Sequence, residues 1–175
     1  MEQPSGTEVI YYSGEIEPTQ KNVLTMSYLS QILRMVYTEE VREKEGGTYG
    51  VSVSGGVSGK PENNYSLTIR FNMSPDRREE LAAIIVREFE KMAAAGPVEE
   101  QVEKTRSYML KTFEENKKKN GAWMRWLQAY YIDGENNYDG YEELVKSITA
   151  EDIRQLAKFI IEQGNFIEVS MVPAE

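Results

Sequence analysis

The sequence contains neither cysteine nor histidine in its 175 residues. Without cysteine the chain has no disulfide, no thiolate metal ligand and no thiol nucleophile, and its redox compartment stays undecided. Without histidine it lacks the commonest general base and the commonest transition-metal ligand, so neither a self-contained zinc site nor a Ser-His-Asp triad is available. Any catalysis that involves this chain must therefore use a base or a metal supplied from elsewhere.

Basic residues and long apolar runs are also scarce. Lys and Arg total 20 against 29 Asp and Glu, which gives a formal charge of −9 and none of the basic surface that nucleic-acid phosphates select. No segment approaches the roughly 20 apolar residues of a membrane-spanning helix, and the first residues lack the basic and apolar regions of a signal peptide. We therefore expect neither nucleic acid nor membrane insertion.

The periodicity of the apolar residues predicts a single domain over residues 1–175, since this length is enough to bury one core. Alternation with period two predicts strands, and spacing of three to four residues predicts helices. The expected strands are 8–13, 49–54, 65–73 and 167–171, and the expected helices are about 20–42, 75–95, 97–119, 123–131, 141–146 and 149–163. This order predicts a two-layer α+β domain, with an antiparallel sheet of about four strands and helices packed on one face.

Polar residues mark the expected helix ends. Thr19 is placed as an N-cap, and Thr149 with Asp152 three positions later forms a capping-box pattern. Gly96 and Gly164 follow the last apolar residues of their helices, where glycine commonly ends a helix. These signals predict where three of the helices begin or end.

The aromatic helix, the lysine run and the glycine-rich stretches could each be read as ligand sites, but a structural interpretation is favoured for each. Trp123, Trp126, Tyr130 and Tyr131 recur at helical spacing and form either a ligand wall or a core face against the sheet. We expect the core face, because large aromatic side chains are usually buried. The run of lysines at 117–119 is expected to be a solvated helix end. The glycine-rich stretches lack the spacing of nucleotide-binding motifs, and no calcium loop is present.

The stretch VREKEGGTYGV, residues 41–51, joins a long helix to a strand. Arg42 either satisfies the carbonyls at the helix end or belongs to a site, and Tyr49 either continues the apolar face of the strand or points elsewhere. The residues alone favour the structural interpretation, since polar residues at helix ends are usually structural.

Five segments of the chain resemble, in order and over nearly its whole length, a C-terminal-half domain of the pitrilysin/insulinase family of zinc metallopeptidases. They are VLTMSYLSQIL, VREKEGGTYGVSVSGG, NYSLTIRFNMSPDRREEL, KKKNGAWMRWLQAYY and SITAEDIRQLAKFII. The anchor of the resemblance is an Arg and a Tyr separated by six residues, with glycines between them, on a helix-to-strand connection. Arg42 and Tyr49 stand at that spacing.

The resemblance implies a function for the pair. In this family an N-terminal-half domain carries the zinc on an inverted motif, and the C-terminal half closes the chamber over a peptide substrate. A chain without histidine is expected to be the non-zinc domain, inactive alone, with the zinc bound by its partner domain and not by this chain. Arg42 is then expected to hold the peptide backbone and Tyr49 to donate to the carbonyl oxygen, while Gly46 and Gly47 let the loop turn.

The resemblance also leaves an alternative, because the family includes members that cleave nothing. The chain would then be a structural or protein-interaction lobe, although the presence of both Arg42 and Tyr49 favours the peptidase interpretation. Family domains generally have strands before the point where this sequence starts, so the resemblance implies an excised fragment that lacks them. The sheet of such a fragment has an unpaired edge, which invites pairing with another copy. Such proteins are often exported, which favours a bacterial periplasm.

Overall fold

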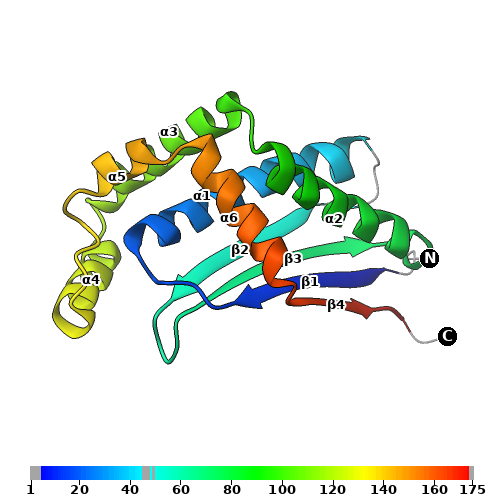
Figure 1. The fold of residues 1–175 in the computed structure, drawn as a ribbon, viewed down its shortest axis with the longest axis horizontal. Helices are drawn as coiled ribbons and strands as arrows, with labels where there is room; N and C mark the ends of the chain where they lie inside the picture. The colour runs from blue at the N-terminus through cyan, green and yellow to red at the C-terminus, as the bar shows by residue number, and fades with distance from the viewer. Residues whose placement is uncertain (1–4, 45–47, 49, 174–175) are drawn as a thin grey trace.

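The fold is a sheet covered on one face by helices, as the periodicity predicts (Figure 1). It was obtained as a computed structural model that describes residues 5–44, 48 and 50–173. The sheet has four strands in the order β2-β3-β1-β4, and all three neighbouring pairs are antiparallel. The strands are β1 (Gly6–Gly14), β2 (Val51–Ser58), β3 (Asn64–Met73) and β4 (Phe166–Met171).

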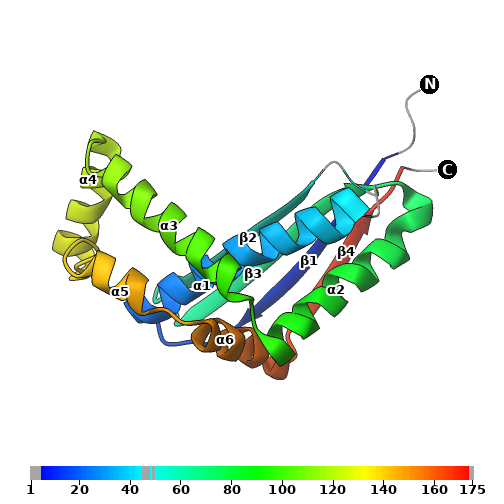
Figure 2. The ribbon, with the colours of Figure 1, turned by 90° about the horizontal axis from the view of Figure 1, so that it is seen from above.

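Three long helices cover one face of this sheet (Figure 2). They are α1 (Gln20–Tyr37), α2 (Arg78–Ala95) and α6 (Ala150–Gln163). Their apolar stripes meet the inward residues of the strands in one core, whose fully buried side chains include Ile10, Leu67, Ile69 and Phe89. The predicted α+β class is therefore confirmed.

The remaining helices form an arm that extends beyond one end of the sheet (Figure 2). The arm consists of α3 (Glu99–Asn116), α4 (Asn120–Gln128) with a π-helical turn over Ala129–Asp133, and α5 (Tyr141–Ser147). Buried contacts join it to the body: the Tyr28 hydroxyl on α1 donates to the Val145 carbonyl at 2.9 Å, and the Arg106 guanidinium donates to the Ile148 carbonyl at 3.0 Å. The arm is therefore attached to the domain through its base.

The aromatic helix is the main departure from the sequence prediction. Trp126 packs on Phe113 of α3 and on Tyr138 of the following loop, with ring centroids 5.5 and 5.1 Å apart. Among the described residues, no aromatic ring of a strand contacts Trp126, Phe113 or Tyr138. Much of the aromatic segment is exposed to solvent, with exposed fractions of 68% for Met124 and 78% for Tyr131. The expectation that this helix face is core against the sheet is wrong, because α4 lies on the arm and not over the sheet.

The predicted helix ends are confirmed where glycine and threonine mark them. Thr19 accepts a hydrogen bond from the Asn22 amide at 3.1 Å, and Gly96 and Gly164 end α2 and α6 with φ of 76° and 69°. Positive φ is the conformation that glycine adopts at little cost. At the start of α2, however, Pro75–Arg77 forms a short 3₁₀ turn, and the α-helix itself begins only at Arg78.

Thr149→Ala is expected to lower the free energy of unfolding by about 1 kcal/mol, the usual effect of losing an N-cap. Thr149 accepts from the Asp152 amide at 3.1 Å, and the Asp152 carboxylate accepts from the Thr149 amide at 2.9 Å. Both bonds satisfy helix-end groups that would otherwise need water. Urea unfolding followed by circular dichroism measures the change, and equal midpoints for Thr149→Ala and wild type would contradict the assigned cap.

Glu168→Gln is expected to raise the melting temperature at neutral pH. Burial, followed by the charge of Glu8 and opposed by Arg78, raises the pKa of Glu168. The pKa of Glu168 is higher in the folded state than in the unfolded state. The stability that protonated Glu168 contributes is therefore present below its unfolded pKa and is lost as pH rises through its folded pKa, whereas glutamine stays neutral throughout. Thermal unfolding should therefore show a gain at neutral pH that disappears below the ordinary pKa of 4.5. A gain of equal size at both pH values would contradict this explanation.

Both β2 and β4 are edges of the sheet. On β2 the Val53 carbonyl accepts from the Arg34 guanidinium at 2.7 Å, so one edge carbonyl already has a partner. Pairing of two copies at an edge remains a prediction.

Candidate functional site

The helix-to-strand connection that carries Arg42 and Tyr49 lies at the start of the edge strand β2. The chain leaves α1 through a π-helical turn over Thr38–Lys44, in which Val41 is fully buried, and enters β2 at Val51. The backbone of Arg42 belongs to this turn. The Arg42 side chain and residues Gly46, Gly47 and Tyr49 lie outside the described residues, so their predicted roles stay predictions.

Two short-range hydrogen bonds lie in the described part of this connection, just before β2. The Thr48 hydroxyl accepts from the Gly50 amide at 3.2 Å and donates to the Gly50 carbonyl at 3.1 Å. Threonine side chains often bond to nearby backbone groups outside helices and strands. These bonds lie immediately before Val51, where β2 begins.

A groove of about 510 Å³ lies beside this point. Its lining combines the first residues of β2, the facing part of β3 and one side chain of α1: Arg34, Gly50, Val51, Ser52, Arg70, Phe71 and Asn72. Two guanidinium groups therefore line a groove that begins one residue after Tyr49. We call this the basic groove.

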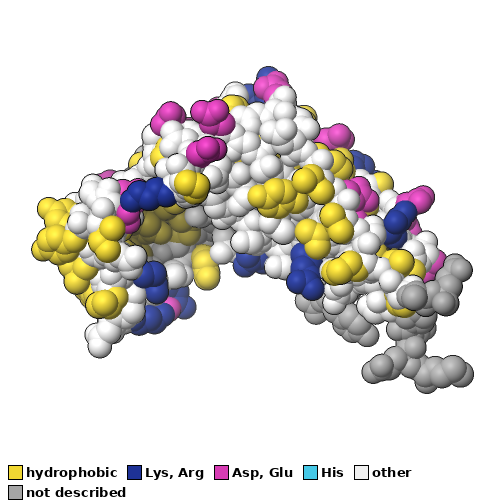
Figure 3. Space-filling model, turned by 90° about the horizontal axis from the view of Figure 1, so that it is seen from below, with side chains coloured by type: hydrophobic (Ala, Val, Ile, Leu, Met, Phe, Trp, Pro, Cys, Tyr) yellow, Lys and Arg dark blue, Asp and Glu magenta, His cyan; other side chains and the backbone are white. Residues whose placement is uncertain are grey.

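The face of the sheet that bears no helices is open to solvent (Figure 3). Outward side chains on β2 and β3 are almost all small and polar, such as Ser52, Ser54 and Thr68. Those on β4 are apolar, namely Ile167, Val169 and Met171, each about half exposed. Together these side chains give the open face a polar half beside the basic groove and an apolar half at the other edge.

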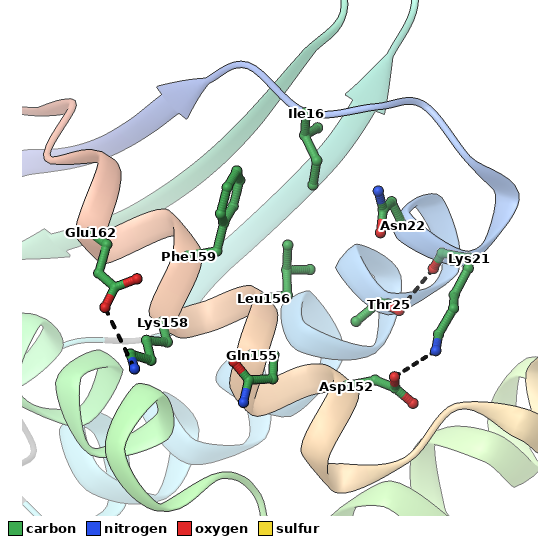
Figure 4. Close-up of a pocket in the computed structure, with 10 residues that line it drawn as sticks. All are labelled: Ile16, Lys21, Asn22, Thr25, Asp152, Gln155, Leu156, Lys158, Phe159 and Glu162. Atoms are coloured by element: carbon green, nitrogen blue, oxygen red, sulfur yellow. Dashed lines mark hydrogen bonds and ion pairs between the residues drawn. The ribbon is translucent and has the colours of Figure 1, made fainter.

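A second groove, of about 500 Å³, lies between the start of α1 and α6 (Figure 4). Its floor includes Leu156 and Phe159, and its rim carries charges that pair with each other. Lys21 contacts Asp152 at 2.6 Å, and on α6 Lys158 contacts Glu162 at 3.6 Å.

The charges on the rim of this second groove are already satisfied. Burial would raise the pKa of Asp152, but hydrogen bonds from Lys21 and Thr149 outweigh it and hold that pKa below its usual value. Asp152 also closes the capping box of α6. This groove is therefore explained by the packing of α1 on α6, and we assign it no ligand.

A zinc ion does not fit the donors of this chain. The sequence supplies no His and no Cys, and within residues 5–44 and 50–173 no three carboxylates come close enough to hold a metal ion. Structural and catalytic zinc sites need three or four such donors.

Within the part of the chain that the structure describes, no helix is long and apolar enough to cross a membrane.

Comparison with known proteins places the chain beside peptidases. The family model of the peptidase M16 inactive domain matches residues 4–109. No protein with a curated description matches the sequence.

Solved structures share the fold over nearly the whole chain. The periplasmic protease PqqL from Escherichia coli superposes with a TM-score of 0.84 at 16% identity, over 99% of this chain and 20% of that one. A protease from Helicobacter pylori gives a TM-score of 0.82 at 12% identity, over 97% of this chain and 41% of that one. A peptidase M16 inactive domain from Pseudomonas fluorescens gives a TM-score of 0.80 at 17% identity, over 100% of this chain and 42% of that one. The chain thus spans between a fifth and about two fifths of these relatives.

Proposed function

Because the chain belongs to the peptidase M16 inactive-domain family, we propose that it is the non-catalytic domain of a zinc metalloendopeptidase and closes the chamber over a peptide substrate. The zinc would be bound by a partner domain, since this chain has no His or Cys to hold it. Arg42 and Tyr49 would contribute to binding the substrate and the transition state. This proposal concerns the parent protein, of which the chain would be one part.

The position of the 41–51 connection carries the proposal. It runs into the first residues of an edge strand, beside the basic groove and the polar half of the open face. An extended peptide lying along this end of the sheet would meet Ser, Asn and Arg side chains, and all three types donate hydrogen bonds. Loop residues on a rigid sheet are well suited to bind such a substrate.

The chemistry of the two side chains fits this role. During hydrolysis, negative charge develops on the oxygen of the scissile carbonyl, and donors aimed at that oxygen lower the barrier most. A phenol hydroxyl and a guanidinium both donate without first losing a proton. Arg42 would hold the peptide backbone, and Tyr49 would donate to the carbonyl oxygen as its charge grows.

The alternative is a structural or interaction lobe with no role in proteolysis. The observation behind it is the set of exposed apolar side chains on the arm, because large exposed apolar patches mark contact surfaces. They include Met124, Tyr131 and Ile132, each more than two thirds exposed. A contact surface on the arm is compatible with both functions and does not separate them.

The test compares the parent protein with a variant that lacks residues 1–175, using an unstructured peptide as substrate. The proposal predicts chelator-sensitive cleavage by the parent and loss of cleavage when the domain is removed. A truncated protein that is folded and still cleaves at the parental rate would support the structural lobe. Circular dichroism of the truncated protein checks that its remaining domains are intact.

A further inference from the structure

The basic groove contains a positive charge that stands alone on the open face. Within the four described strands, the outward side chains include one charged group, Arg70 on β3. Its register neighbours are Ser52 on β2 and Val9 on β1, neither of which is acidic. In a chain with a formal charge of −9, an exposed arginine whose register neighbours among the described residues are neutral is a distinct local feature.

Arg34 adds a second guanidinium that pairs with no carboxylate of the described residues. Its Nη2 donates to the Val53 carbonyl at 2.7 Å and its Nη1 to Gln31 Oε1 at 3.5 Å. Both acceptors are neutral, so they orient the side chain without cancelling its charge. The bond to Val53 also holds Arg34 against the edge of β2.

Most other arginines of the described chain contact a carboxylate. Five of them form ion pairs: Arg77, Arg78, Arg87, Arg106 and Arg154. Among the arginines whose side chains the structure describes, Arg34, Arg70 and Arg125 have no carboxylate within ion-pair distance. Two of these three line one groove.

The groove also offers neutral donors. Asn72 Oδ1 accepts from the Thr7 hydroxyl at 3.0 Å, which leaves the amide nitrogen of Asn72 as a donor. Ser52 lies on the neighbouring strand, directly opposite Arg70. Two guanidinium groups with hydroxyl and amide donors form the kind of environment that carboxylates bind, since arginine recognises them through paired N–H groups.

We propose that the basic groove binds a carboxylate of the peptide substrate, so that Arg34 and Arg70 select peptides that present a carboxylate there. This inference rests on the proposed function, because it takes a peptide to lie beside the 41–51 connection. The carboxylate would come from an Asp or Glu side chain or from the end of the peptide. Arg34 and Arg70 would be specificity-determining residues.

The test measures binding of fluorescently labelled, unstructured peptides to this chain by anisotropy, with no need for cleavage. One peptide carries a central Glu, a second carries Gln at that position, and each is made with a free and with an amidated C-terminus. An exposed guanidinium–carboxylate pair changes affinity by a few fold at most. We expect the Glu peptide to bind about twofold to fivefold more tightly than the Gln peptide, with the difference reduced at high salt.

Variants assign that difference to the groove. Arg70→Gln and Arg34→Gln should each reduce the preference for Glu, whereas Arg125→Gln, an exposed arginine on α4, should leave it unchanged. If amidation and not the Glu-to-Gln change lowers affinity, the carboxylate recognised is the peptide terminus, and the same two variants should abolish that effect. Circular dichroism confirms that each variant is folded.

Two outcomes would overturn the inference, and they differ in what else they contradict. Peptides that bind equally well whatever their charge, with no change in Arg70→Gln, would overturn the carboxylate site and leave the peptide-binding function standing. A chain that binds none of the four peptides would contradict the proposed function, and the carboxylate site with it.

Discussion

Tyr49→Phe in the parent protein is expected to lower kcat/KM for peptide cleavage by about 10²–10³, the usual effect of removing one donor from the developing oxyanion. The phenyl ring keeps the size of the side chain and loses only the hydroxyl. Because the charge on the carbonyl oxygen grows in the transition state, the loss should fall mainly on kcat. Arg42→Ala should lower kcat/KM and, unlike Tyr49→Phe, should also raise KM, since the guanidinium would hold the peptide before reaction. Steady-state kinetics on a fluorogenic peptide measures both.

A matched control separates the role of Tyr49 from a general loss of structure. Tyr108 is about half exposed on α3, and Tyr108→Phe removes a hydroxyl from the same domain. We expect this variant to cleave at the wild-type rate. Wild-type kinetics for Tyr49→Phe would show that its hydroxyl takes no part in the reaction.

Phe89→Ala is expected to lower the free energy of unfolding by about 3–5 kcal/mol, the range for removing a large aromatic side chain from a core. Phe89 on α2 is fully buried and packs edge-on against Tyr12 of β1, with ring centroids 5.0 Å apart and planes at 64°. The substitution would leave a cavity between α2 and the sheet. Such a loss is a large part of the stability of an ordinary domain.

Urea unfolding of Phe89→Ala can be paired with Tyr131→Ala. Tyr131 is 78% exposed on the arm, so its truncation should change stability by no more than about 0.5 kcal/mol. A loss of similar size in both variants would mean that the exposed arm residue contributes as much to stability as the buried α2–sheet interface. That result would contradict the two-part description of the fold.

The elements of the domain could be predicted because each has a strong local signal. In residues 65–73 apolar and polar side chains alternate, and this stretch forms β3 with its apolar side chains buried. The capping pattern at Thr149 and the glycine at 164 mark the two ends of α6. In each case short-range chemistry and tertiary packing favour the same structure.

The environment of α4 could not be predicted in the same way. Aromatic residues at helical spacing indicate that a helix has an apolar face, but spacing does not say which surface that face meets. Trp126 meets Phe113 of α3, and the Trp123 indole donates to the Lys117 carbonyl at 2.8 Å. The contacts of α4 are therefore made within the arm, while Met124 and Ile132 remain exposed.

The basic groove was missed because its two arginines are far apart in the sequence. Arg70 occupies a wet position in an alternating strand, where a charged residue is ordinary. Arg34 lies on a helix, and only the packing of α1 beside β2 brings it to the same edge. The available signal was the scarcity of charge among the outward residues of the strands, which becomes meaningful only when the register is known.

As proposed, this chain is a working part of a peptidase active site. The most direct measurement mixes the chain, produced separately, with the remainder of its parent and follows hydrolysis of an unstructured peptide with and without a chelator. We expect chelator-sensitive cleavage that requires both pieces and falls by about 10²–10³ when the chain carries Tyr49→Phe. Cleavage by the remainder alone, unchanged when the chain is added, would contradict it.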